Sequence, residues 1–243
     1  MLASLVTRSK RRVVPFEIGF VRRGADDASL PPPPLATSVR GGRGGEVRLK
    51  LFLSMQLIAV RSPYNVTRKA ASWAALLCLP DPDVNGARRV NDAITWLEDK
   101  MLIRTERRPG GPSEVFLLSQ LGTGAAYSRP GPGGRYINLP VAFWENGWIV
   151  ALSAPAIAMW LITREMQGGK KSPEQVWVSP ALAKERYDLS NDTRTKGTHE
   201  LEEHGLLTIG RTKQGDEWTW DRLRNTYWLH LDRLDDEPAL ASR

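Results

Sequence analysis

A seven-residue pattern recurs in this chain at a constant spacing of 104 residues. Residues 97–103 read Leu-Glu-Asp-Lys-Met-Leu-Ile, and residues 201–207 read Leu-Glu-Glu-His-Gly-Leu-Leu. Each copy follows a segment with helical character and leads into two short runs typical of strands. The leucine can pack a helix on a core, the fifth residue can turn the chain out of that helix, and the apolar pair can begin a strand. The repeat therefore predicts two copies of one helix-and-hairpin unit.

The first unit is expected to span residues 46–120. Its apolar residues recur at helical spacing, and Pro109-Gly110-Gly111-Pro112 is a strong turn signal between two strand-like runs. The predicted elements are helices over about 47–60, 69–79 and 86–100, followed by strands at 102–107 and 114–118.

The second unit is expected to span residues 136–234. Ser153, Ser179 and Ser190 each precede a helical segment, where a serine oxygen can accept a hydrogen bond from the first turn. Pro155 suits a first helical turn, and Gly205 suits the residue that follows a helix. The predicted elements are an extended piece at 136–140, helices at about 154–167, 180–187 and 191–204, and strands at 176–178, 206–211 and 226–231.

Three segments lie outside these units. Residues 1–45 contain Pro31–Pro34 and a glycine-rich stretch, and are expected to be a disordered basic tail. Residues 121–135 are expected to be a flexible Gly/Pro linker, and residues 235–243 a C-terminal tail. Of 34 Lys+Arg and 27 Asp+Glu, residues 1–50 hold ten and four, so they carry most of the net charge of +7. The N-terminal tail is either dispensable, even a misassigned start, or a basic arm that touches phosphates.

The order of these elements resembles the winged-helix family. The family pattern is two helices, a recognition helix that ends in a Leu-Glu-x-x-Gly-Leu-Ile-like corner, and a two-stranded wing. The second unit matches it through Gly205, whereas the first has Met101 where glycine is usual. The resemblance implies a mainly α fold with small β-wings, built as two winged helix-turn-helix modules in tandem. It also implies a helix in the DNA major groove and a wing on the adjacent backbone or minor groove.

The resemblance places the DNA-contacting residues on the polar faces of the two recognition helices and on the wings. Arginine can grip guanine bidentately and asparagine can grip adenine, so these residue types suit base readout. On the helices, the expected residues are Arg88, Arg89, Asn91, Asp92, Thr95, Asn191, Arg194, Thr195, Lys196 and His199. On the hairpins, they are Arg104, Arg107, Arg108, Arg211, Lys213, Arg222 and Arg224.

These features predict a sequence-specific double-stranded DNA-binding protein, acting as a transcriptional regulator in the cytoplasm, in association with the nucleoid. One alternative is a replication initiator of a plasmid or mobile element that binds origin repeats. Another is a protein–protein adaptor without DNA contact, which the nearly neutral body of residues 51–243 keeps open. Two copies could pair through Leu49, Phe52, Leu53 and Leu57, although such residues more often face their own core.

Catalytic and metal-binding patterns are missing from the sequence. It contains no phosphate-cradling G-x-x-x-x-G-K-[ST] motif and no nucleophile elbow, so we expect no enzyme, cofactor or small-molecule ligand. His199 and His204 are five residues apart, which places them on different faces of a helix. Cys78, the single cysteine, excludes an internal disulfide and is expected to be buried. The longest apolar stretch, 148–162, is too short and too interrupted to span a membrane.

Overall fold

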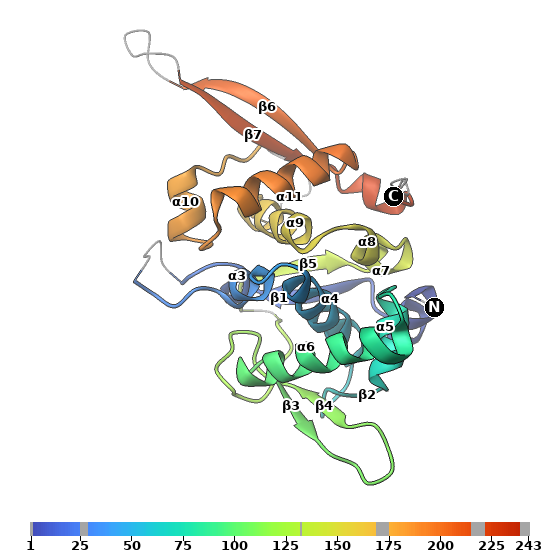
Figure 1. Ribbon diagram of the computed structural model, residues 1–243. Coiled ribbons are helices and arrows are strands. Elements are labelled where there is room, and N and C mark those ends of the chain that lie inside the picture. The colour runs from blue at the N-terminus through green and yellow to red at the C-terminus, as the bar shows by residue number, and fades with distance from the viewer. Residues whose placement is uncertain (1, 25–28, 132, 169–174, 215–221, 239–243) are drawn as a thin grey trace.

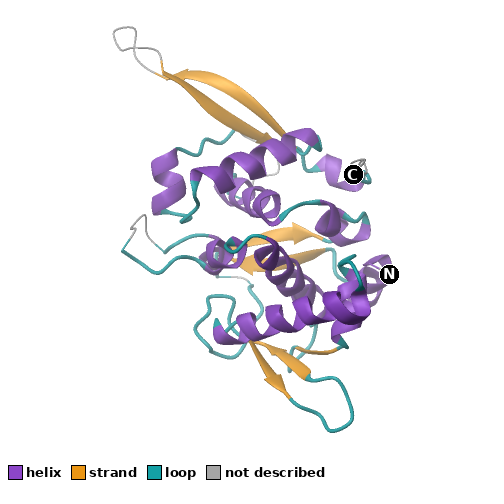
Figure 2. Ribbon diagram, viewed as in Figure 1, coloured by secondary structure: helices purple, strands orange, loops and turns teal. Residues whose placement is uncertain are grey.

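The computed structural model describes residues 2–24, 29–131, 133–168, 175–214 and 222–238, and these form a mainly helical protein with small antiparallel sheets (Figures 1 and 2). The helices are α1 (Leu2–Ser9), α2 (Ile18–Val21), α3 (Pro34–Val39), α4 (Arg43–Ile58), α5 (Ala70–Leu76), α6 (Ala87–Asp99), α7 (Ala142–Glu145), α8 (Trp148–Ala151), α9 (Ala154–Met166), α10 (Pro180–Glu185) and α11 (Asn191–Glu203). The strands are β1 (Val13–Glu17), β2 (Asn65–Thr67), β3 (Ile103–Glu106), β4 (Glu114–Leu117), β5 (Tyr136–Pro140), β6 (Leu207–Gln214) and β7 (Arg222–Leu229).

The first unit combines α4, α5 and α6 with a three-stranded sheet. The strand order is β2-β4-β3, so the short strand that precedes α5 pairs with the last strand of the hairpin. A π-helical turn over Pro82–Gly86 leads from α5 to α6, and the Asp81 side chain accepts a hydrogen bond from the backbone N–H of Asn85. The predicted helices and strands of this unit are confirmed within a few residues at their ends.

The second unit repeats this arrangement with α9, α10, α11 and the β6–β7 hairpin. Val176 forms an isolated bridge with Tyr227 on β7, so the segment before α10 again pairs with the last strand. The three predicted serine caps are confirmed, because the oxygens of Ser153, Ser179 and Ser190 accept hydrogen bonds from first-turn N–H groups. The β6–β7 hairpin begins its return strand earlier than the sequence indicates, which makes it the longer of the two (Figure 1).

The expectation of a disordered tail over residues 1–45 is wrong for the residues that the structure describes. Strand β1 pairs antiparallel with β5 at the centre of the molecule, with Val14 opposite Leu139 and Phe16 opposite Ile137 (Figure 1). The buried Gln120 side chain also donates to the Pro15 carbonyl at 3.1 Å. Pairing with β5 satisfies the backbone hydrogen-bonding groups of β1 and buries its apolar side chains. The strand is too short for its sequence periodicity alone to reveal it.

Each unit therefore begins with a strand of the central β1–β5 pair. In Figure 1, the hairpins of the two units point to opposite ends of the molecule, and α6 and α11 run in opposite directions across the view. Three buried pairs share one spacing of 123 residues, namely Val14 and Ile137, Phe16 and Leu139, and Phe20 and Phe143. The repeat is thus longer than the 46–120 and 136–234 boundaries indicate.

Helices α4 and α9 are the buried axes of the two units. In α4 even Ser54 and Gln56 are inaccessible, and the Trp144 indole donates to the Ser54 hydroxyl at 3.0 Å. Residues 49–57 of α4 are all buried, and a helical segment buried on all sides lies inside a core. One apolar cluster runs through both units. The residues that could have formed a homodimer contact, Leu49, Phe52, Leu53 and Leu57, are fully buried in this core and unavailable to a second copy.

Three further expectations are corrected. The segment 121–135 is not a free tether, because Tyr127 is buried against Tyr64 and the Arg135 carbonyl accepts a hydrogen bond from the Ile18 N–H at 3.0 Å. The start of the C-terminal tail is packed, since the Trp148 indole donates to the Asp236 carbonyl at 3.0 Å. Cys78 is exposed, not buried, because it occupies the left-handed position just after α5, where the side chain leaves the helix surface.

Candidate nucleic-acid interface

The two corners at the ends of α6 and α11 have the same hydrogen bonds. The Leu102 N–H donates to the Leu97 carbonyl at 3.0 Å, and the Leu206 N–H donates to the Leu201 carbonyl at 2.8 Å. Met101 and Gly205 both adopt positive φ, 55° and 68°, and their N–H groups bond the Glu98 and Glu202 carbonyls. This is the Schellman helix end, so the sequence repeat corresponds to a repeated backbone geometry.

The glutamate of each corner ties the helix to its hairpin. The Glu98 carboxylate accepts the Thr105 N–H at 2.8 Å, and the Glu202 carboxylate accepts the Ile209 N–H at 3.3 Å. A charged acceptor on a strand N–H makes a stronger bond than a neutral one. The orientation of the hairpin relative to the helix is thus held by an equivalent contact in both units.

Helix α6 presents the predicted polar face to solvent. Its core side buries Val90, Ala93 and Leu97. On the opposite side, Arg88, Asn91, Asp92 and Thr95 are exposed, and among the described residues none of these four side chains has a hydrogen bond or ion pair. Arg89 is half-buried and engaged within the protein. A basic and amide-bearing surface therefore lies at the N-terminal half of α6, where the helix dipole also favours anions.

Helix α11 is exposed on the equivalent face, but its charges are more often paired. Lys196 lies 3.0 Å from Asp192, and His199 lies 3.1 Å from Glu203. Asn191 and Thr195 are exposed. Arg194 is half-buried and donates to the Val178 carbonyl at 3.0 Å, so its guanidinium ties α11 to the segment before α10.

The predicted cations of the first hairpin divide into paired and unpaired groups. Arg104 forms an ion pair with Glu106 and stacks over Phe116 at 4.5 Å, and Arg108 forms an ion pair with Glu114. Arg107 is exposed at the start of the hairpin loop, with no ion pair among the described residues. Arg107 is consequently the hairpin cation of this unit that is best placed to meet an external anion.

The second hairpin brings Arg211 beside α11. A hollow of about 380 Å³ between helix and hairpin is lined by Arg194, Thr195 and His199 from α11, and by Arg211 and Asn225 from the strands. Lys213 is exposed further out and engaged within the protein. Arg224 lies 4.1 Å over the Trp177 ring, and the side chain of Arg222 lies outside the part that the structure describes.

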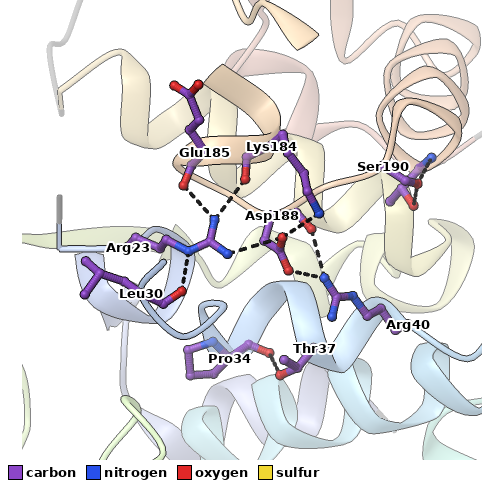
Figure 3. Close-up of polar contacts among 10 residues, drawn as sticks. Arg23, Leu30, Pro34, Thr37, Arg40, Lys184, Glu185, Asp188 and Ser190 are labelled. Carbon is purple, nitrogen blue, oxygen red and sulfur yellow. Dashed lines mark hydrogen bonds and ion pairs between the residues drawn. The ribbon is translucent and has the colours of Figure 1, made fainter. Parts of the chain in front are cut away.

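A buried ion network at the turn between α10 and α11 fixes the second unit to the N-terminal part of the chain (Figure 3). Arg23 is only 6% exposed and donates to the carbonyls of Lys184 and Glu185, at 2.8 and 2.6 Å, at the end of α10. Its guanidinium also lies 3.2 Å from Asp188, which forms a second ion pair with Arg40. A cation on helix-terminal carbonyls is favourable, and the carboxylate compensates its buried charge.

Electrostatics favours the ionised form of Asp188. Burial opposes ionisation of this carboxyl, but the hydrogen bonds from Lys184 and Arg23 and the charge of Arg40 outweigh it and lower its pKa. Close by, burial and the neighbouring Glu165 carboxylate raise the pKa of Tyr187, whose hydroxyl donates to Glu165 at 2.6 Å. Both groups therefore stay in one protonation state at neutral pH and serve as fixed contacts.

Other kinds of site find little support in the described residues. His204 packs edge-on against Trp148 while His199 pairs with Glu203, so the two histidines point to different partners. Within the described ranges, no cluster of three or more His, Cys, Asp or Glu side chains could hold a metal ion. None of the helices described is long and apolar enough to cross a membrane.

Comparisons with known protein families and with curated proteins find no match to this chain.

One basic site was expected only as a possible basic arm of the N-terminal segment, without the residues that complete it. Arg8, Lys10, Arg11 and Arg12, assigned to a disordered tail, lie beside Arg61 and Arg129 around a single hollow. The run of four cations in five residues was the available signal, but its partners are about 50 and 120 residues away in the sequence. The Arg11 hydrogen bonds to the Gln56 and Ala59 carbonyls bring the first segment beside Arg61, and the β1–β5 pairing brings it towards the segment that holds Arg129.

Proposed function

We propose that this protein binds double-stranded DNA in a sequence-specific manner through two winged helix-turn-helix units, with α6 and α11 as the recognition helices. The observation that carries the proposal is the repeated corner: two helices with exposed polar faces end in the same Schellman geometry and lead into the same type of hairpin. A helix of this kind fits the major groove, and the hairpin beside it fits the adjacent backbone.

The attachment of the units supports a site of fixed length. The β1–β5 pair, the shared core and the Arg23–Asp188 network join the two units, so α6 and α11 keep one relative position. We therefore propose that both helices engage a single site whose two halves have an invariant separation. This differs from the flexible tether expected from sequence, with which the separation could vary.

The test is selection of bound sequences from a random duplex pool, followed by titration of the best duplex. We expect a bipartite site, and inserting five base pairs between its halves should weaken binding about as much as deleting one half, because the second half rotates to the other side of the duplex. Enrichment of no sequence, and no binding to any duplex at low salt, would refute the proposal. That result would favour a docking module for another protein.

The biological role that we propose is transcriptional regulation in association with the nucleoid. Replication initiation is the second candidate, because two units that read one site of fixed length also suit an array of origin repeats. The place where the selected sequence occurs distinguishes these two roles. A single site at a promoter supports the regulator, and an array of direct repeats beside the gene supports the initiator.

A further inference from the structure

A strongly basic hollow lies away from α6 and α11. It has a volume of about 610 Å³ and is lined by Arg8, Lys10, Arg11, Arg12, Arg61 and Arg129. None of the described lining residues is acidic, and none is aromatic. The hollow is formed where the turn between α1 and β1 meets the end of α4 and the segment before β5.

One of these cations is structural and holds the floor of the hollow. The Arg11 guanidinium donates to the Gln56 carbonyl at 2.7 Å and to the Ala59 carbonyl at 3.1 Å, which are terminal carbonyls of α4. Its Nε is buried and has no hydrogen-bond partner within the described structure. Arg11 therefore fixes the turn and leaves one donor unsatisfied.

The other five cations are exposed and point to an external partner. Among the described residues, no carboxylate pairs with Arg8, Lys10, Arg12, Arg61 or Arg129. The like charges also disfavour one another: burial lowers the pKa of Arg11 and the Arg129 charge adds to this effect, while burial and then the Arg8 charge lower the pKa of Arg68. An anion in the hollow would relieve this repulsion.

We propose that this hollow binds consecutive phosphates of the DNA backbone, as a contact separate from the two recognition helices. Guanidinium groups match phosphate oxygens in bidentate geometry. Five exposed cations exceed what one inorganic phosphate requires but suit several phosphodiesters with one charge each. The lack of an aromatic side chain in the described lining excludes the stacking platform that recognition of unpaired bases uses. This inference rests on the proposed function.

The experiment measures duplex affinity against salt concentration for the full chain and for two double variants, each with one pair of substitutions. Arg12→Gln with Arg61→Gln removes two cations of the hollow, and Arg135→Gln with Arg233→Gln removes two exposed arginines elsewhere. For the first pair, we expect the slope of log K against log salt to fall by about 2 and affinity at 0.1 M salt to fall roughly 10- to 100-fold. The sequence preference should not change. The second pair should behave as the wild type does.

The outcomes separate this inference from the proposed function. If the variant with Arg12→Gln and Arg61→Gln binds duplex DNA with wild-type affinity and salt slope while Arg88→Ala loses binding, the inference is overturned and the proposed function stands. If the wild-type chain binds no duplex, both fail. The second arm of the experiment uses inorganic pyrophosphate as the ligand. If pyrophosphate raises the Tm of the wild type but not of the Arg12→Gln, Arg61→Gln variant, and both proteins have the same salt slope for DNA, the site takes a free anion. That result would overturn the assignment to the DNA backbone.

Discussion

The exposed faces of α6 and α11 differ in how their charged side chains are engaged. On α6, Arg88 and Asp92 make no ion pair with any described residue, whereas on α11 Lys196 and His199 each pair with a carboxylate one turn away. Such exposed pairs are weak, about 0.3–0.5 kcal/mol each, but a ligand must compete with them. If the proposed function holds, the first unit offers the more open helix surface to an anionic partner, and the second unit offers the longer hairpin.

The units also differ in the turn between their second and third helices. In the second unit, Asp188 follows α10 and joins the buried ion network, whereas the equivalent residue after α5 is the exposed Cys78. We predict that Asp188→Asn lowers the free energy of unfolding by about 3 kcal/mol, because it leaves the Arg23 charge buried without its carboxylate. Chemical denaturation at pH 7 measures this, and Cys78→Ser is the matched control, with little expected effect.

The ion network around Asp188 also predicts that the stability difference between wild type and Asp188→Asn depends on pH. The pKa of Asp188 is lower in the folded protein than in the unfolded chain, so its ionised form stabilises the fold above the unfolded pKa. This contribution is lost as the pH falls through the folded pKa. The unfolding free energies of wild type and Asp188→Asn should therefore converge in acid, and a constant gap down to pH 2 would contradict the assignment.

The packing of the third helix on the first gives the next prediction. A Cβ on Gly197 of α11 would lie 2.3 Å from the Pro155 carbonyl oxygen, whereas the corresponding residue of α6 is the buried Ala93. We expect Gly197→Ala to destabilise the protein by about 2 kcal/mol, because α11 must move away from α9. Ala93→Gly should cost about 1 kcal/mol, through backbone entropy. Equal thermal shifts for the two variants would show that α9 and α11 are not in tight contact.

A binding comparison follows from the faces of the two helices. If the proposed function holds, Arg88→Ala should weaken the selected duplex by about 1–3 kcal/mol and relax specificity at one position. Lys196→Ala should have a smaller effect, since the lysine already neutralises Asp192 within the helix. Fluorescence titrations against the selected site and a scrambled duplex measure both, and a larger loss for Lys196→Ala would reverse the proposed ranking of the two units.

The smallest predicted effect tests the repeated corner itself. Met101 adopts a left-handed conformation that glycine adopts without strain, so Met101→Gly should raise stability by about 1 kcal/mol. Gly205→Ala should lower it by a similar amount, for the same reason in reverse. Opposite shifts in Tm would confirm that the two corners are equivalent, and shifts of the same sign would show that the Met101 side chain contributes packing that glycine cannot replace.

Much of the fold could be predicted from local signals. The helices over 86–100 and 191–204 end within a residue or two of the predicted positions, since the Leu-Glu corner encodes a backbone geometry that needs no distant contact. Strand β1 could not be found in this way, because five residues including Pro15 form a strand only when β5 is beside them.

The candidate site could be predicted in part. Residue type and helical periodicity placed Arg88, Asn91 and Thr95 on the exposed face of α6, and the structure agrees. Periodicity could not indicate that Arg108 pairs with Glu114 or that Arg194 is held by the Val178 carbonyl, because those partners come from other elements. Whether the exposed residues contact DNA stays a prediction.

The pairing of β1 with β5 has a consequence for synthesis of the chain on the ribosome. The partner of Val14 is Leu139, so the first strand must wait for more than 120 residues to be translated before its hydrogen bonds can form. An open strand edge is prone to pair with other chains. We infer that a nascent or truncated chain that stops before residue 136 exposes this edge and is prone to aggregate, and that the N-terminal unit reaches its final form only after the second has begun to emerge.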